Sequence, residues 1–194
     1  MKAASIDWIL ASASPRRKQL LQDLGIAFRA ETAKVEEWEA TDGDPAEVVA
    51  HNARLKADAV SRLHPRAYVI GSDTTVALAG RIFHKPTDLG EAHQMLRSLS
   101  GRTHQVYTGV YLIHRNSGYQ SDFVESSEVT FHQLSDDDIA AYFQQVNPLD
   151  KAGGYGIQEH REAIIASWKG SLSNVMGLPI ERLAIIMGNI FPNP

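Results

Sequence analysis

The sequence predicts an α/β fold, because strand-like segments alternate with helical segments along the whole chain. The chain has 194 residues, of which 43% are hydrophobic, and this is enough to bury a sizeable core. That length fits one large domain or two small lobes that share a cleft. No internal repeat, low-complexity tract or linker divides the sequence.

The first half of the chain opens with a strand that runs into a helix through the small-residue loop of ILASASPRRKQLL. Ser14 suits the N-cap of this helix, Pro15 suits its first position and Gly25 suits its end. The other segments expected in this half are a strand at 8–11, a strand at about 28–32, a helix at about 45–63, and a buried strand at 67–73 that TVALAG continues in extended form.

The second half is expected to contain a hairpin, with one helix before it and two helices, an irregular segment and a short strand after it. Residues 103–114 and 119–131 alternate in polarity around NSG, which is typical of a hairpin. Ser135 suits the cap of a helix whose first turn carries aspartates, as the helix dipole favours. The remaining segments are a helix at about 92–99 ended by Gly101, the irregular NPLDKAGGYGIQ, a short strand AIIASW, a last helix at about 179–187, and a PNP tail expected to fray.

A lysine interrupts the apolar stripe of the helix expected at 45–63. A helix brings residues three to four apart onto one side, so five residues should share a face: Val49, Ala53, Lys56, Val60 and Leu63. Two interpretations of the lysine stay open. Its stem lies along the core while its amine reaches water, or its amine points into a polar cleft.

Carboxylates follow two of the expected strands. Asp73 ends the apolar strand at 67–73, and ligand sites of α/β proteins lie at such strand ends. A turn-forming aspartate is the alternative, because Asp often bonds to its own backbone. The pair Glu36–Glu37 is either a solvated loop or, if it meets Asp73, part of a cluster that suits Mg²⁺ or Mn²⁺.

Two further segments carry residues that the fold alone does not require. Lys85 stands just ahead of a proline turn in HKPTD. In DKAGGYGIQ, three glycines surround Tyr155 and precede Gln158. Glycine backbone permits close approach to a ligand, and a glutamine amide can read a base edge with its donor and acceptor. A plain flexible loop is the competing interpretation.

Two arginines occupy the first turn of the first helix, where the positive end of the dipole disfavours cations. Arg16 and Arg17 therefore require a negative partner. With Lys56 and Lys85 they offer positive charge, and three carboxylates offer oxygen ligands of the kind that metals take: Glu36, Glu37 and Asp73. A polyphosphate with a divalent metal needs both sets at once.

The composition excludes several classes of protein. The net charge of −4 argues against a nucleic-acid partner, which normally requires a basic surface. The absence of cysteine excludes disulfides, thiolate zinc sites and cysteine nucleophiles. MKAASIDWIL does not resemble a signal peptide, and no apolar run approaches ~20 residues, so we expect a soluble cytoplasmic protein with no membrane partner. The P-loop, GxSxG and HExxH motifs do not occur.

The chain resembles the Maf family of nucleoside triphosphate pyrophosphatases over nearly its whole length, through LASASPRRKQLL, VEE, GSDTTV, KP, LSGRTHQVYTG, LDKAGGYGIQ and VMGLP. The resemblance implies a single domain over 1–194 with the elongated, two-lobed mixed-sheet fold of inosine triphosphate pyrophosphatase and a central active-site cleft. It implies hydrolysis of a nucleoside triphosphate to the monophosphate and pyrophosphate with Mg²⁺ or Mn²⁺. A house-cleaning role also follows from the resemblance, and a homodimer is the default expectation.

Carried over to this chain, the resemblance makes Asp73 the acceptor of a proton from water that attacks the α-phosphate, either directly or through the metal. Glu37 is favoured over Glu36 as a metal ligand with Asp73, because the family accepts either acid at the first position. Four other residues match the remaining polar positions of the family's site: Ser12, Arg17, Lys56 and Lys85. Ser14 is added because it lies at the helix N-terminus that would hold phosphate oxygens.

Three residues match the positions that the family associates with substrate choice: Arg16, Thr74 and Gln158. They resemble the dTTP/UTP branch, whereas the 7-methyl-GTP branch has an aromatic residue, a glutamine and a glutamate there. One departure bears on the substrate, because this chain continues YGIQ with Glu159 where the branch is usually glycine-rich. The alternatives are the same chemistry on modified pyrimidine, 7-methyl-GTP or inosine-type triphosphates, and a nucleotide-binding regulator of cell division that does not hydrolyse.

Overall fold

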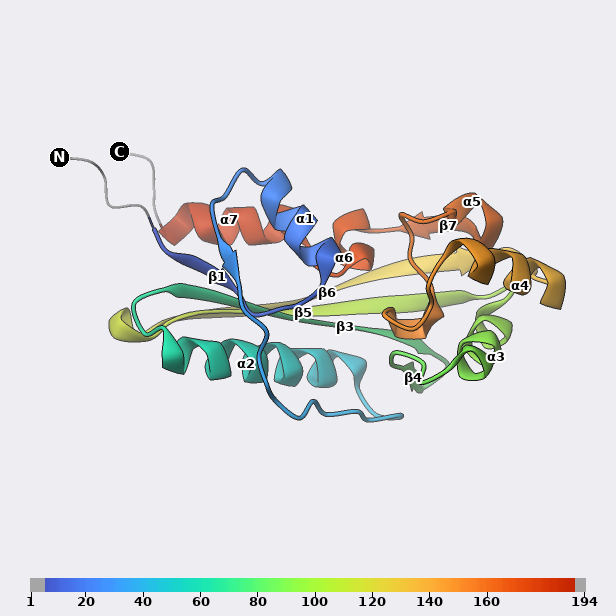
Figure 1. The fold of residues 1–194 in the computed structure, drawn as a ribbon, viewed down its shortest axis with the longest axis horizontal. Helices are drawn as coiled ribbons and strands as arrows, with labels where there is room; N and C mark the ends of the chain where they lie inside the picture. Colours follow the sequence, from blue (N-terminus) through green and yellow to red (C-terminus); the bar gives the residue numbers. More distant parts are fainter. Residues whose placement is uncertain (1–5, 191–194) are drawn as a thin grey trace.

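A computed structural model describes residues 6–190, so the expected fraying of the PNP tail lies outside the described residues. A seven-stranded mixed sheet forms the centre of the molecule, in the order β2-β1-β3-β5-β6-β7 with β4 paired to β3. Three long strands run along the elongated molecule (Figure 1): β3 (Tyr68–Leu78), β5 (Thr103–His114) and β6 (Tyr119–Phe131). Four short strands extend the sheet: β1 (Trp8–Leu10), β2 (Arg29–Ala30), β4 (Arg81–Phe83) and β7 (Ile165–Lys169). The predicted α/β class is confirmed.

Helices cover both faces of this sheet (Figure 1). One face carries α1 (Pro15–Asp23), α6 (Leu172–Met176) and α7 (Ile180–Ile190), and the other carries α2 (Pro45–Leu63). The far end of the molecule holds α3 (Leu89–Leu99), α4 (Asp136–Gln145) and α5 (Arg161–Ile164), and short 3-10 turns occupy 115–117 and 152–154. Within residues 6–190, no helix combines the length and the apolar character that a membrane span requires.

Local capping signals set the helix boundaries as predicted. The Ser14 side chain accepts a hydrogen bond from the backbone of Arg17 at the start of α1, and Pro15 holds the first helical position. Ser135 forms a capping box with Asp138 at the start of α4. Gly25, with a φ of +71°, follows the end of α1 in the left-handed conformation that favours glycine.

Three expectations need correction, and helix α6 was missed. Asp73 does not end a strand: β3 continues to Leu78, because its ladder with β5 extends through Ala77. The start of the expected strand AIIASW, at 163–164, is the end of the short helix α5. Leu63 leaves the apolar stripe, being 71% exposed where α2 ends outside the core. Helix α6 was not expected, although Ser171 caps it and Gly177 ends it with a φ of +108°.

Two glycines let α2 lie unusually close to the sheet. A Cβ added at Gly71 of β3 would stand 2.1 Å from the Ala53 carbonyl oxygen, and one added at Gly109 of β5 would stand 2.4 Å from that of Val49. Gly109 is the register partner of Asp73. The close approach therefore presses the polar side chains of α2 onto β3 at Asp73.

A gap along one edge of β3 separates the two ends of the molecule. Strand β1 pairs with residues 68–70 of β3, and β4 pairs with residues 76–78 on the same side. Between them, residues 71–75 have no strand on that side within the part of the chain that the structure describes. Three separate apolar clusters fill the molecule. Two lie at one end, where the first packs α1 and α7 against the sheet and the second lies under α2. The third surrounds α3 and α4 at the other end.

We predict that Gly71→Ala lowers the free energy of unfolding by about 1–3 kcal/mol or more, because the new methyl group overlaps the backbone of α2. Urea unfolding followed by circular dichroism measures this change. Gly188→Ala is the matched control, since no atom of the described residues lies within 4 Å of a Cβ added there. It should leave stability unchanged or raise it by up to about 1 kcal/mol. Equal stability of the two variants would contradict the proposed close packing.

Candidate functional site

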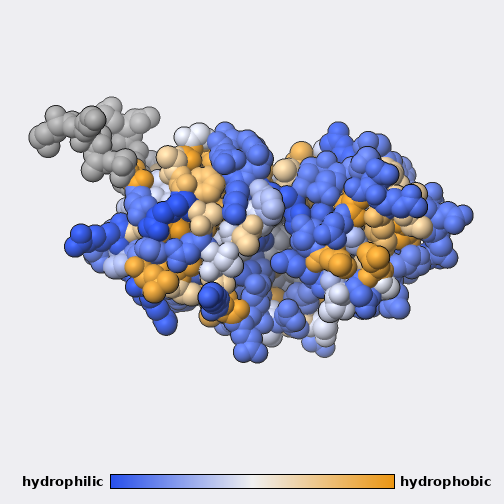
Figure 2. Space-filling view, in the orientation of Figure 1, coloured by the Kyte–Doolittle hydropathy of each residue, from blue (hydrophilic) through white to orange (hydrophobic). Residues whose placement is uncertain are grey.

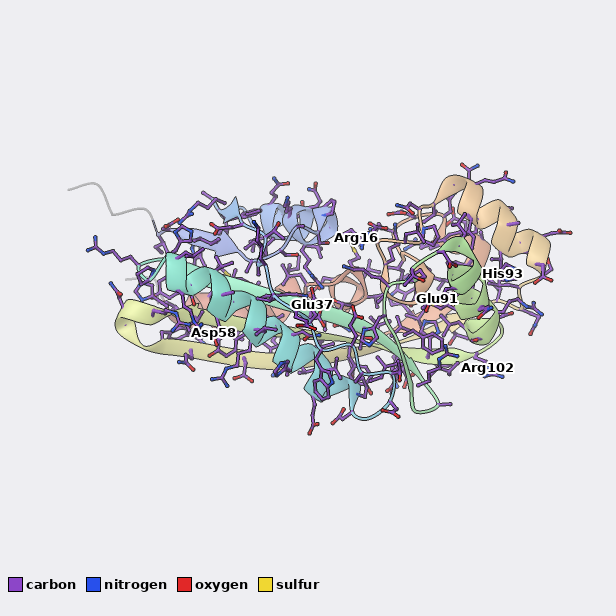
Figure 3. The ribbon with its side chains drawn as sticks, turned by 60° about the horizontal axis from the view of Figure 1, so that its bottom comes forward. Arg16, Glu37, Asp58, Glu91, His93 and Arg102 are labelled. Atoms are coloured by element: carbon purple, nitrogen blue, oxygen red, sulfur yellow. The ribbon has the colours of Figure 1, made fainter. Side chains whose placement is uncertain are left out.

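A cleft of about 430 Å³ lies beside the gap in β3, where the loop before α1, the loop before α2 and the segment after α4 meet. Figure 2 shows the surface hollowed near the middle of the long axis. Figure 3 places Arg16 and Glu37 in this middle region, whereas Glu91, His93 and Arg102 lie toward one end. Of the residues expected to form the site, Glu36 does not line the cleft and the others do: Ser12, Ser14, Arg16, Arg17, Glu37, Lys56, Asp73, Thr74, Lys85 and Gln158.

The amine of Lys56 joins two carboxylates in this cleft. Its Nζ lies 2.7 Å from Asp73 Oδ1 and 2.7 Å from Glu37 Oε2. The side chains of Lys56 and Asp73 are only 11% and 12% exposed, whereas that of Glu37 is 38% exposed. The amine therefore points into the polar cleft, which decides between the two interpretations of the lysine. Glu37, the second residue of the Glu36–Glu37 pair, is therefore linked to Asp73 through the Lys56 amine.

Asp73 is held as a carboxylate. Burial raises its pKa, but the charges of Lys56 and Arg17 and the hydrogen bonds from Lys56 and Asn52 act in the opposite direction. The net effect places the Asp73 pKa below its ordinary value. The group is therefore negatively charged and able to accept a proton at neutral pH.

Arg17 reaches the cleft from the other face of β3. Its Nε donates to the Gly177 carbonyl at 2.7 Å, and its two terminal nitrogens donate to Thr74 Oγ1 at 2.9 Å and to Ser12 Oγ at 3.3 Å. Ser72 also donates to the Gly177 carbonyl, at 3.0 Å. Because successive strand residues point to opposite faces, Ser72 and Thr74 meet α1 and α6, while Asp73 between them meets α2.

Arg16 has its negative partner within the chain. It donates to Asp150 Oδ2 at 2.8 Å and to the Asp150 backbone carbonyl at 2.9 Å. This two-point contact ties the start of α1 to the glycine-rich segment 150–158. The partner of Arg16 was not identified from sequence, although Asp150 opens the motif DKAGGYGIQ; the two residues stand 134 positions apart.

Lys151 fixes the same segment from within. Its side chain is 5% exposed, and its amine donates to the Asn147 carbonyl at 2.8 Å and to Asp150 Oδ1 at 2.8 Å and lies 3.1 Å from Glu159 Oε2. Glu159, the departure from the branch pattern, is therefore an ion-pair partner of Lys151, which lines the cleft. Gln158 and Lys85 are exposed at the cleft, and within residues 6–190 neither side chain forms a hydrogen bond or ion pair.

Sequence reasoning also missed Asn52, the buried amide that contacts Asp73. Its Nδ2 donates to Asp73 Oδ2 at 3.1 Å. The residue lies one turn before Lys56 on α2, so helical spacing places both on one side of the helix. This spacing of four residues from Lys56 is the feature of the sequence that could have identified Asn52.

The described residues contain no group of three or more His, Asp or Glu side chains arranged to hold a metal ion. The cleft instead brings two carboxylates, Glu37 and Asp73, to one point. Mg²⁺ is commonly bound by only one or two carboxylates, with substrate phosphates and water completing its shell. The donor set therefore fits such an ion.

A mixed α/β fold whose central cleft brings a buried and an exposed carboxylate together with lysines and arginines defines a protein built for an anionic, phosphate-bearing ligand. Residues 7–190 match the family model for Maf-like proteins, and the chain belongs to the Maf family. It is 46% identical to a dTTP/UTP pyrophosphatase of Akkermansia muciniphila, over 89% of this chain and 90% of that protein. It is 43% identical to a dTTP/UTP pyrophosphatase of Syntrophus aciditrophicus, over 90% of this chain and 85% of that protein.

A solved structure supports the fold. The structure of a HAM1 protein from Coxiella burnetii superposes with a TM-score of 0.51 at 15% identity, covering 95% of this chain and 99% of that one. At this identity the likeness concerns the fold alone. It agrees with the expectation of an elongated mixed-sheet architecture.

We predict that Asp73 makes the free energy of unfolding fall more steeply as the pH is lowered. Its folded pKa is lowered, so its stabilising contribution is complete above the unfolded pKa of about 3.9 and is lost as pH falls through the folded value. The urea midpoint of Asp73→Asn should therefore decline less than that of the wild type between about pH 5 and about pH 2. The exposed Asp42→Asn serves as the control and should keep the wild-type slope. Identical slopes in all three proteins would refute the assignment.

Proposed function

We propose that this protein hydrolyses dTTP and UTP to the nucleoside monophosphate and pyrophosphate. The observation that carries the proposal is an ionised, buried Asp73 hydrogen-bonded to Lys56, in a cleft that also presents Arg17 and Lys85. Membership in the Maf family and the names of the two relatives support the reaction and the substrate class. Modified pyrimidine triphosphates fall within the same proposal.

The triphosphate would bind at the start of α1. The side chains of Ser12 and Ser14 line the cleft there, and the N-terminus of a helix favours anions through its free N–H groups and its dipole. Arg17 is already oriented by Gly177, Thr74 and Ser12, so little freedom is lost when it binds phosphate. Lys85, which forms no ion pair with any residue from 6 to 190, would neutralise charge on the departing pyrophosphate.

The chemical step is a displacement at the α-phosphorus. Water forms a bond to the α-phosphorus, the bond from that phosphorus to the bridging oxygen of the β-phosphate breaks, and pyrophosphate leaves with the electron pair. Asp73 accepts the proton of the water. Lys56 keeps Asp73 ionised and oriented before the step, and it compensates the negative charge of Glu37 beside it.

A divalent cation, Mg²⁺ or Mn²⁺, is the proposed cofactor, and Glu37 and Asp73 are the residues that would hold it. When bound, it would polarise the α-phosphate and make the water more acidic. The orientation of Glu37 and Asp73 by Lys56 and Asn52 is the contribution of the chain itself.

Base recognition is proposed for Gln158, supported by Thr74 and Arg16. Thr74 contacts Arg17 and Thr108, and Arg16 is engaged by Asp150, so these two side chains shape the pocket. Gln158 presents an uncommitted amide donor and acceptor, which can pair with the edge of uracil or thymine. A pocket of this size would select the pyrimidine over larger purines.

The proposal includes the setting in which the protein works. We propose one domain over residues 1–194 around this cleft, a cytoplasmic location, and no nucleic-acid or membrane partner. The absence of cysteine suits a reducing compartment. A homodimer is proposed because closed symmetric dimers are the commonest oligomers.

The test is pyrophosphate release from a panel of triphosphates: dTTP, UTP, CTP, 5-methyl-UTP, 7-methyl-GTP, ITP, ATP and GTP, each with Mg²⁺, Mn²⁺ or EDTA. We expect metal-dependent turnover confined to uracil and thymine nucleotides. Preference for 7-methyl-GTP or ITP would contradict the proposed substrate but would still agree with the proposed reaction. Tight binding without turnover would contradict the enzymatic proposal and favour a nucleotide-binding regulator.

We predict that Asp73→Asn lowers kcat by about 10²–10⁴-fold, the usual contribution of a proton acceptor. The variant keeps the size of the side chain, so far-ultraviolet circular dichroism should match the wild type. Asp58→Asn, which removes a carboxylate that pairs with Arg115 away from the cleft, is the control and should keep kcat. Near-wild-type turnover by Asp73→Asn would refute the role of this carboxylate.

A further inference from the structure

The buried amide of Asn52 connects Asp73 to the loop that carries Glu37. Asn52 lies on α2 and is 2% exposed. Its Nδ2 donates to Asp73 Oδ2 at 3.1 Å and to the Trp38 backbone carbonyl at 3.1 Å. Its Oδ1 accepts the Trp38 backbone N–H at 2.8 Å. One side chain therefore holds the residue next to Glu37 at two points and holds Asp73 at a third.

The loop needs such an anchor. Residues 31–44 contain no helix or strand. The Glu31 backbone N–H bonds to Leu10 at the beginning of the loop, and the Ala40 and Thr41 carbonyls accept hydrogen bonds from His84 and Ile82 near its end. Between these points, the two backbone hydrogen bonds to Asn52 are the ones that the structure shows for residues 32–39. The backbone beside Glu37 is thus held by Asn52, while the Glu37 side chain is held by Lys56 and the Trp38 ring lies against His51.

No other side chain of similar size provides this set of bonds. An amide has two N–H donors and a carbonyl acceptor, and here both donors and the acceptor are in use. An aspartate would lack both donors and add a charge against Asp73. A leucine would fill a similar volume but remove all three bonds, and the buried Asp73 carboxylate would lose one of its hydrogen-bond donors, which is costly for a buried charged group.

We propose that Asn52 is a positioning residue of the hydrolytic site, which sets Glu37 opposite Asp73 by clamping the backbone of Trp38 and fixing the Asp73 carboxylate. This inference rests on the proposed function for its kinetic consequence. Its geometric part concerns the free protein and stands independently of turnover.

Amide hydrogen exchange of the free wild-type protein tests the clamp without any substrate. The Trp38 amide should exchange much more slowly than those of Glu36 and Glu39, for which the structure gives no hydrogen bond within residues 6–190. In Asn52→Leu the protection of Trp38 should be lost. Ser61→Ala, which removes another buried polar side chain of α2 at a site facing Arg115, is the matched control and should leave it unchanged. An unprotected Trp38 amide in the wild type would overturn the proposal.

Steady-state kinetics test the consequence for the reaction. Asn52→Leu should lower kcat by about 10–100-fold, the usual effect of losing a group that orients a ligand-bearing carboxylate. KM should change little, because Asn52 contacts none of the proposed phosphate-binding side chains. Ser61→Ala should keep both constants. Should Asn52→Leu fail to fold, Asn52→Ser, which cannot make the three bonds together, takes its place with the same expected loss. Wild-type kcat in a folded Asn52 variant would overturn the proposal.

A double-variant cycle separates positioning from a general loss of structure. If Asn52 acts partly through Glu37, then Glu37→Gln should cost much less in the Asn52→Leu background than in the wild type. Fully independent effects of the two substitutions on kcat would overturn the positioning role. Failure of the wild type to hydrolyse any triphosphate would contradict the proposed function instead, while the exchange measurement would still decide whether the clamp exists.

Discussion

A single lysine amine shared by two carboxylates is the interaction on which the rest of the cleft depends. Lys56 stands 2.7 Å from both Asp73 and Glu37. Burial by itself disfavours the charged form of Asp73 and so raises its pKa. The adjacent amine reverses this preference and keeps a proton acceptor ready at neutral pH. Removing one partner of such a pair leaves an uncompensated buried charge, so the pair also ties function to stability.

The sheet topology creates the place for this pair. Strands β1 and β4 both pair with the same side of β3 and leave residues 71–75 without a strand there. Side chains from both faces of β3 can therefore approach one cleft: Asp73 from the face of α2, and Thr74 from the face of α1 and α6. The glycines at 71 and 109 bring α2 close enough for Asn52 and Lys56 to reach Asp73.

Features encoded in short stretches of sequence were predictable. The helical stripe that contains Lys56, the caps at Ser14 and Ser135, and the hairpin around NSG depend on neighbours within a few turns or strands. The buried His104 packs against the rings of Phe131 and Tyr155 in the core. It contacts the Tyr155 hydroxyl at 2.7 Å, and burial lowers its pKa to about 3, so it stays neutral. The resemblance to the Maf family identified the cleft residues from motifs rather than from physics.

Features set by distant partners were not predictable. The sequence pattern predicts Asp73 at the end of a strand that TVALAG continues in extended form, whereas β3 runs on because it pairs with β5; Gln105, the partner of Ala77, lies 28 residues further along the chain. The partner of Arg16 was expected to be a bound anion, yet the chain supplies Asp150 from 134 positions away. Asn52 was overlooked because its role depends on Trp38 and Asp73, which meet only in the folded protein.

The central claim is that water attacks the α-phosphorus in this cleft. The most direct measurement is a single turnover of dTTP or UTP in ¹⁸O-labelled water, followed by mass spectrometry of both products. The account predicts one ¹⁸O atom in the nucleoside monophosphate and none in the pyrophosphate. Label in the pyrophosphate would place the attack on the β-phosphorus and contradict the account.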